Sequence, residues 1–174
     1  MRLRWIGWLA GSIAAGAAAQ PNPSPFASEI AAFAQADQAN PPKPCALLFV
    51  GSSSIRLWQS LAADMAPYRV INRGFGGSTI ADVNLHFDRA VAPYRPKAIF
   101  FYAGENDLNG GKSPVEVRAD FDRFLQRKAR TLGATPVYFI SLKPSKARFA
   151  QMGKQAQVNA AVRVLAKRRA DLHF

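Results

Sequence analysis

Cysteine is nearly absent from the sequence, and histidine is scarce. Cys45 is the single cysteine, and only two histidines occur among the 174 residues. One cysteine can form neither an internal disulfide nor a cysteine-ligated metal cluster. The sequence therefore excludes a disulfide-stapled scaffold and a zinc finger, and we expect neither a metal site nor a cofactor. Because Cys45 opens an apolar run, it is expected to be a small buried residue.

A hydrophobic run long enough to span a bilayer is also absent. The most apolar stretch, IGWLAGSIAAGAAA at residues 6–19, is shorter than the ~20 residues that a transmembrane helix needs. It follows a short basic segment containing Arg2 and Arg4, and it ends in small residues suited to signal cleavage. We therefore predict a signal peptide at residues 1–19 and a secreted or periplasmic protein. Retention of this segment as an anchor is the alternative.

Acidic residues are few. The chain has 11 Asp and Glu against 23 Lys and Arg, which gives a formal net charge of +12. The cations are spread along the chain, with one short run at residues 167–169, and no zinc-finger or aromatic RNA-binding pattern accompanies them. We interpret them as a solvated basic surface and expect no nucleic-acid partner. A basic binder of nucleic acid or of an envelope surface remains a third hypothesis, and steeply salt-dependent affinity would support it.

Apolar strand-like runs alternate with helical patterns over residues 20–174, which fits one domain with a parallel sheet. The predicted fold is α/β, a three-layer αβα sandwich with a flavodoxin-like sheet and a truncated fifth strand. The hydrophobic content of 49% is enough for a real core. Strands are predicted at 45–50, 68–75, 96–104 and 135–142, with a fifth beginning at 171–174; helices are predicted from Ser24, at 54–65, at 79–91, at 113–133, and around Val158, Ala161, Val162 and Leu165.

Two helices have clear start signals. Thr79 precedes Asp82 at capping-box spacing, and Ser113 precedes Glu116 in the same way. Gly133 is placed to end the second of these helices.

Small and polar residues follow the first three predicted strands, where α/β sheets bind ligands. They are GSSS at 51–54, GFGGST at 74–79 and GENDLNGG at 104–111. Each has a plain structural interpretation: a turn and cap, a flexible loop, and an Asn-Asp turn. The glycines of the second loop also resemble a dinucleotide loop, but the third glycine of that motif is missing and the loop follows the wrong strand.

Taken together, the three loops resemble the conserved blocks of the SGNH hydrolases, the GDSL-type esterase, lipase and acylhydrolase superfamily. LLFVGSSSIRLW resembles the serine block, INRGFGGSTIADV the glycine block and KAIFFYAGENDLNGG the asparagine block. The resemblance implies that Ser53 is the nucleophile and that Ser52 stands where many members have aspartate. It also implies an oxyanion hole formed by the backbone N–H groups of Ser53 and Gly77 and by the side-chain amide of Asn106.

The family takes its catalytic base from an Asp-x-x-His block after the fifth strand. Neither histidine fits this role: His86 lies along a predicted helix, and His173 follows Asp171 with one residue between them at the start of a strand. We therefore expect the domain to be C-terminally incomplete and to lack the base.

The leading hypothesis is an exported serine esterase or acylhydrolase that acts on an acyl ester, acetyl esters included. The alternative is a non-catalytic module that retains the oxyanion pocket and binds an acyl ligand. The expected partner is a small-molecule, carbohydrate or lipid ester.

Overall fold

The computed structural model describes residues 25–43 and 45–174. The predicted signal peptide and the expected cap at Ser24 lie outside these residues. None of the described helices is long and apolar enough to cross a membrane.

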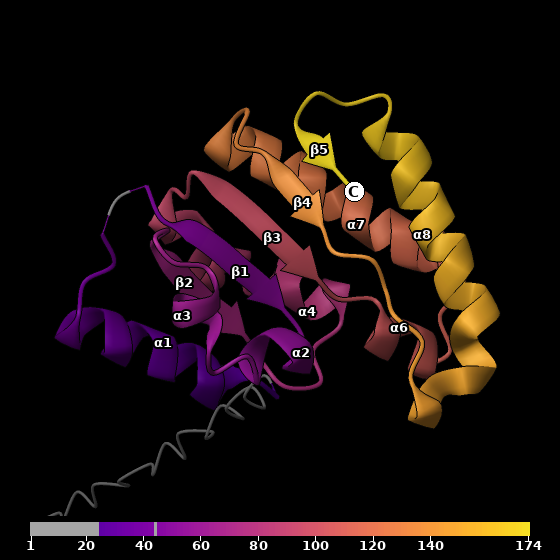
Figure 1. Cartoon of the computed structure of the whole chain (residues 1–174), viewed down its shortest axis with the longest axis horizontal. Coiled ribbons are helices and arrows are strands. Elements are labelled where there is room, and N and C mark those ends of the chain that lie inside the picture. Colours follow the sequence, from indigo (N-terminus) through magenta and orange to yellow (C-terminus); the bar gives the residue numbers. More distant parts are fainter. Residues whose placement is uncertain (1–24, 44) are drawn as a thin grey trace, which may run out of the picture.

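Five parallel strands form one sheet in the order β2-β1-β3-β4-β5 (Figure 1). The chain moves outward from β1 to β2 and then crosses back to β3, so a topological switch point lies between β1 and β3. Ligands of such sheets bind beyond the carboxyl ends of the strands at this point. The strands are β1 Leu47–Gly51, β2 Val70–Gly74, β3 Ala98–Tyr102, β4 Val137–Phe139 and β5 Leu172–His173.

Helices flank the sheet, as the alternating sequence pattern predicts. In Figure 1, α4, α7 and α8 lie behind the sheet or beside it, while α2 and α3 lie in front of β1 and β2. Arg73 of β2 pairs with Asp37 of α1, which places α1 at the β2 edge. The helices are α1 Ala27–Ala39, α2 Ser53–Arg56, α3 Leu61–Asp64, α4 Ile80–Leu85, α5 Phe87–Ala90, α6 Glu105–Asn109, α7 Pro114–Leu132 and α8 Met152–Ala166, with short 3-10 turns η1 Ala92–Tyr94 and η2 Lys146–Gln151.

Both predicted capping boxes are present. The Thr79 hydroxyl accepts from the Asp82 backbone N–H, and the Asp82 carboxylate accepts from the Thr79 backbone N–H. At the start of α7 the Ser113 hydroxyl accepts from the Glu116 backbone N–H, and the Glu116 carboxylate accepts from the Ser113 backbone N–H. Gly133 follows the last residue of this helix. The side-chain contacts satisfy backbone donors that the first helical turn leaves unpaired.

Two predicted helices are interrupted. The helix expected at 54–65 divides into α2 and α3, and that expected at 79–91 divides into α4 and α5 at His86. In the first case the Trp58 indole and the Ser60 hydroxyl both donate to the Asp64 carboxylate, at 2.6 Å each. Side-chain bonds of this kind compete with a continuous helix.

The prediction of a buried Cys45 is wrong. Cys45 is exposed and has a φ of 62°, because the chain still turns after the proline-rich stop of α1. Strand β1 begins two residues later, at Leu47.

The main core lies between the sheet and α7. Phe101 of β3 is fully buried there, with ring centroids 5.1 Å from Phe121, 4.6 Å from Phe124 and 6.1 Å from Phe139. Burial of these rings supplies much of the apolar driving force for docking α7 on the sheet.

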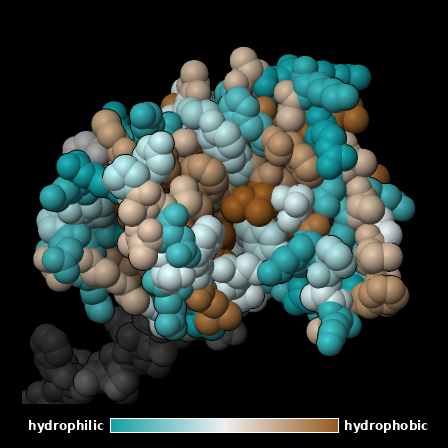
Figure 2. Space-filling model, viewed as in Figure 1, coloured by the Kyte–Doolittle hydropathy of each residue, from teal (hydrophilic) through white to brown (hydrophobic). Residues whose placement is uncertain are grey.

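The opposite sheet face carries a row of aromatic rings. Phe49, Phe100, Tyr138 and His173 occupy paired positions on successive strands, and their rings are stacked at 4.6, 4.9 and 4.6 Å. Tyr138 is 38% exposed, and no described helix lies over β4 and β5 on this side (Figure 1). Figure 2 shows apolar surface over this face with a hydrophilic rim. The front helical layer therefore covers β1 and β2 but not β4 and β5.

Candidate active site

Ser53 begins α2, directly beyond the carboxyl end of β1. Its neighbour Ser52 is buried and donates its backbone N–H to the Tyr102 carbonyl at 2.9 Å, which ties this turn to the end of β3. Ser53 itself is half-buried. Its hydroxyl and its backbone N–H form no hydrogen bond with any other described residue. A serine hydroxyl and a backbone donor, both unused by the other described residues, therefore lie together at the switch point.

Gly51, the last residue of β1, allows the backbone there to lie close to the Tyr102 carbonyl at the end of β3. A Cβ at this position would lie 1.9 Å from the Tyr102 carbonyl oxygen, and the residue has a φ of +139°. Only glycine accepts both conditions without strain.

The loop after β2 presents Gly77. This residue is exposed with a φ of +80°, and a Cβ there would meet nothing within 4 Å. Its backbone N–H is not used by any described acceptor. The adjacent Ser78 is buried, and its hydroxyl donates to the Gly51 carbonyl at 3.2 Å.

Asn106 lies in the first turn of α6, beyond β3. Its Nδ2 group donates to the Ser78 carbonyl at 2.9 Å, and its Oδ1 accepts from Arg148 Nη2 at 2.7 Å. A carboxamide nitrogen carries two hydrogens, so one donor remains available.

Hydrogen bonds join all three loops. The Gly51 carbonyl accepts from Phe75 and Ser78 of the second loop, Ser52 bonds to Tyr102 before the third, and Asn106 bonds to Ser78. The structure thus brings the loops of Ser53, Gly77 and Asn106 together, as the resemblance implied. Their combined donors suit an oxygen that becomes negatively charged in acyl transfer.

A buried ionic network supports the third loop. Both Asp107 carboxylate oxygens accept from the Ile80 backbone N–H, at 3.2 and 3.0 Å, and Lys112 Nζ lies 3.1 Å from Oδ1. Burial raises the pKa of Asp107, while the Ile80 N–H and Lys112 oppose this rise. Burial acts against the charge of Lys112, but hydrogen bonds to Asp120 and Asp107 raise its pKa overall. The network fixes α6 against the start of α4.

Tyr102 adds a buried hydroxyl near the loops. The residue is 3% exposed, and its hydroxyl makes no hydrogen bond of good geometry with the described residues. Burial, and next the neighbouring Glu105 carboxylate, raise its pKa. A raised pKa favours the neutral form of Tyr102.

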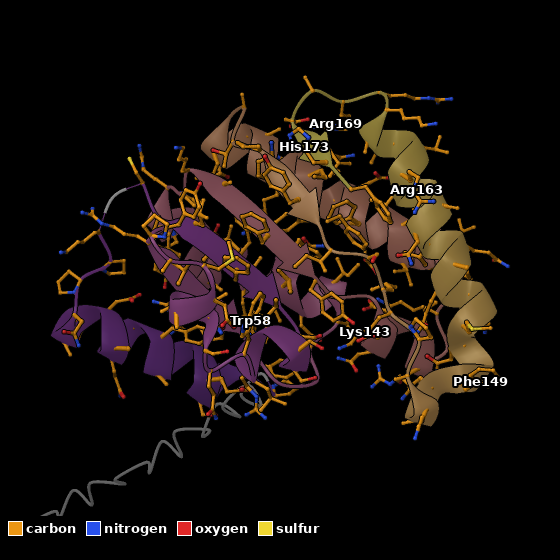
Figure 3. The ribbon with its side chains drawn as sticks, viewed as in Figure 1. Trp58, Lys143, Phe149, Arg163, Arg169 and His173 are labelled. Atoms are coloured by element: carbon orange, nitrogen blue, oxygen red, sulfur yellow. The ribbon has the colours of Figure 1, made fainter. Side chains whose placement is uncertain are left out.

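Neither histidine forms a hydrogen bond through which it could act as a base for Ser53. His173 lies on β5, three strands from β1, which is about 14 Å at ~4.8 Å per strand spacing. Figure 3 shows it toward the end of the sheet opposite to Trp58 and Lys143. His86 follows α4 and packs edge-on against Phe75, with centroids 5.9 Å apart, and burial lowers its pKa. No hydrogen bond joins either histidine to Ser53.

Two polar contacts to the site were missed from the sequence. Glu29 of α1 accepts from the Gly76 backbone N–H at 3.1 Å and pairs with Arg56 at 3.6 Å, so it supports the loop of Gly77. Arg148 reaches Asn106 from 42 residues away. A local sequence pattern cannot predict contacts between residues so far apart along the chain. Within the described ranges, no cluster of three or more His, Cys, Asp or Glu side chains could hold a metal ion.

The family model described as GDSL-like Lipase/Acylhydrolase matches residues 11–174. The comparison with curated proteins gives no match. Among solved structures, a Streptococcus pneumonia protein superposes with a TM-score of 0.72 and 19% identity over 84% of this chain and 72% of that chain. A GDSL-like lipase from Bacteroides thetaiotaomicron gives a TM-score of 0.67 and 19% identity over 81% and 74%. The SGNH-hydrolase family esterase AlinE4 gives a TM-score of 0.57 and 21% identity over 75% of each chain.

Proposed function

Because the chain belongs to the GDSL-like lipase/acylhydrolase family, whose members are carboxylic ester hydrolases, we propose that Ser53 is an acyl acceptor served by a three-donor oxyanion hole. One observation carries this proposal. Three loops joined by hydrogen bonds present a serine hydroxyl and three donor hydrogens that the described residues leave unused, at Ser53 N, at Gly77 N and at the second hydrogen of Asn106 Nδ2.

In this reaction the Ser53 oxygen adds to the ester carbonyl carbon. The carbonyl oxygen gains negative charge and is held by the three donors, and the alcohol then leaves to give an acyl-serine that water hydrolyses. No described histidine bonds to Ser53, so in this proposal water takes its proton. We therefore propose slow acylation by reactive esters, with the natural acyl and alcohol groups undefined.

The absence of a described histidine at Ser53 favours a second candidate, a module that holds an acyl or acetylated ligand without cleaving it. The two functions differ in covalent chemistry, because only the hydrolase forms a bond to Ser53.

Diisopropyl fluorophosphate distinguishes them. The Ser53 oxygen displaces fluoride from phosphorus, and the added phosphoryl group is located by mass spectrometry of peptides. We expect one group per chain at Ser53, none in Ser53→Ala, and full labelling in Ser54→Ala. Turnover of p-nitrophenyl acetate that is slow and lost in Ser53→Ala agrees with the proposal. A folded protein in which Ser53 stays unlabelled after prolonged exposure, and which gives no Ser53-dependent turnover of p-nitrophenyl acetate, would rule out the hydrolase.

We also propose export, on the basis of the N-terminal pattern of residues 1–19. N-terminal sequencing of the protein from a secreting bacterial host tests this. A mature chain that begins near Gln20 supports export, and an intact Met1 in a cytoplasmic fraction contradicts it.

A further inference from the structure

The short turn η2 docks onto α6 through its side chains. Arg148 Nη2 donates to Asn106 Oδ1 at 2.7 Å, and Gln151 Nε2 donates to Asn109 Oδ1 at 2.9 Å. Within η2, Arg148 departs from helical geometry, with φ −129° and ψ 26°. In Figure 1 this turn follows the segment that leaves β4 and lies beside α6. A segment far along the sequence thus reaches a side chain of the oxyanion hole.

The contacts of Asn106 define the orientation of its carboxamide. The Ser78 carbonyl can only accept a hydrogen bond, and the Arg148 guanidinium can only donate one. If the carboxamide were rotated by 180°, its oxygen would face the Ser78 carbonyl and its NH2 group would face the guanidinium. Both contacts would be repulsive. Arg148 and Ser78 together therefore keep Nδ2, with its one unused hydrogen, on the side of the loop that carries Gly77 and Ser78.

The charge of Arg148 also polarises this carboxamide. None of the described carboxylates lies within ion-pair distance of the guanidinium, so its positive charge is not neutralised nearby. A charge-assisted hydrogen bond to Oδ1 draws electron density from the amide and makes its N–H a stronger donor.

We propose that Arg148 is a positioning residue of the oxyanion hole, which holds Asn106 in its donor orientation and strengthens its N–H. This inference rests on the proposed function of Ser53. Arg148 acts through Asn106 and does not itself contact the reacting ester.

The test compares Arg148→Met, which removes the charge and the donor, with Arg148→Lys, which keeps the charge. Lys146→Met is the matched control, since Lys146 is an exposed cation of the same turn. The first measurement is the rate at which diisopropyl fluorophosphate labels Ser53. We expect a fall of about 10- to 100-fold in Arg148→Met, a smaller fall in Arg148→Lys, and a change of less than twofold in Lys146→Met. Added methylguanidinium should restore part of the rate of Arg148→Met only.

The second measurement does not depend on activity. In an ¹H–¹⁵N NMR spectrum the two Nδ2 protons of Asn106 should shift and exchange faster with water in Arg148→Met, but not in Lys146→Met. Unchanged Asn106 signals together with wild-type labelling would overturn the inference, as would equal losses in Arg148→Met and Lys146→Met. If wild-type Ser53 is not labelled, the proposed function fails, and the NMR signals still decide whether Arg148 positions Asn106. If Arg148→Met does not fold, Arg148→Lys provides both measurements.

Discussion

At the scale of single residues, the account depends on the unused hydrogen of the Asn106 carboxamide. We expect Asn106→Ala to slow phosphorylation of Ser53 by about 10²–10³-fold, because one charge-stabilising donor is removed from the transition state. The rate of labelling by diisopropyl fluorophosphate measures this. Asn40→Ala, which removes an exposed carboxamide at the end of α1, should keep the wild-type rate. Equal rates in the wild type and Asn106→Ala would show that this side chain is not part of the hole.

Glu29 gives a second prediction at this scale. Replacing it by Ala removes the acceptor of the Gly76 N–H and the partner of Arg56, so the loop of Gly77 should lose part of its order. We expect a fall of about tenfold in the labelling rate, of the order of one lost hydrogen bond to a charged group. The control is Glu116→Ala, which removes a cap of α7 and should be labelled at the wild-type rate. A wild-type labelling rate in Glu29→Ala would contradict the proposal that Glu29 supports the loop of Gly77.

The sequence predicts Ser53, Gly77 and Asn106 as site residues, because each lies inside a short motif, and hydrogen bonds in the structure join the three loops that carry them. It could not predict Arg148 or Glu29. Their contacts join positions 42 and 47 residues apart, and an isolated Arg or Glu on a polar segment looks like any other surface charge.

At the scale of the elements, a buried lysine joins α7 to the residue that precedes β5. The Lys128 side chain is 0% exposed, and its Nζ lies 2.5 Å from the Asp171 carboxylate. We expect Asp171→Asn to lower the free energy of unfolding by about 3 kcal/mol, because the charge of Lys128 stays buried without its partner. Lys128→Met should cost about 1 kcal/mol or less, since Asp171 keeps Arg169. Urea unfolding measures both, and equal losses would contradict this asymmetry.

The same contact predicts a pH dependence. A hydrogen bond from Arg169, followed by the contact with Lys128, lowers the pKa of Asp171 from 3.8 to about 2. A lowered folded pKa contributes stability above the unfolded value, and this contribution is lost as the pH falls toward the folded value. The stability difference between the wild type and Asp171→Asn should therefore be constant above about pH 5 and shrink between about pH 4 and 2. A difference that does not change over this interval would refute the assignment.

The starts of the two helices with side-chain caps are predicted to within a residue, whereas internal breaks are not. Thr79 and Ser113 mark helix starts because their capping hydrogen bonds join residues three positions apart, a spacing that can be recognised in the sequence. The break before Ser60 depends on which side chains compete for Asp64, and the exposed Cys45 depends on where the chain joins the sheet. These outcomes require the tertiary structure.

At the scale of the whole molecule, apolar surface and positive charge act against each other. Phe100 and Tyr138 line a shallow cavity of about 510 Å³ on the sheet face that lacks a described helical cover. The formal net charge of +12 opposes association, and salt screens this repulsion.

We therefore expect light scattering by the protein to rise as salt increases from about 0.02 M to about 0.5 M. Tyr138→Lys should suppress this rise, because it places a charge on the apolar face. Val115→Lys, at a position 78% exposed on α7, should not. Salt-independent scattering, or equal protection by both variants, would contradict the role of this face.

The alternation of strands and helices predicted a parallel sheet, and the structure confirms it. The alternation alone fits several strand orders, and the observed order is that of the predicted flavodoxin-like sheet. The order β2-β1-β3-β4-β5 follows from which apolar faces pack in three dimensions, and it places the loops of Ser53 and Asn106 on neighbouring strands.

A crystal structure of the chain after reaction with diisopropyl fluorophosphate would test the account most directly. We expect the phosphorus bonded to the Ser53 oxygen and one phosphoryl oxygen within about 2.7–3.1 Å of Ser53 N, Gly77 N and Asn106 Nδ2. A phosphoryl group on another residue, or one whose oxygen points away from Gly77 and Asn106, would contradict it.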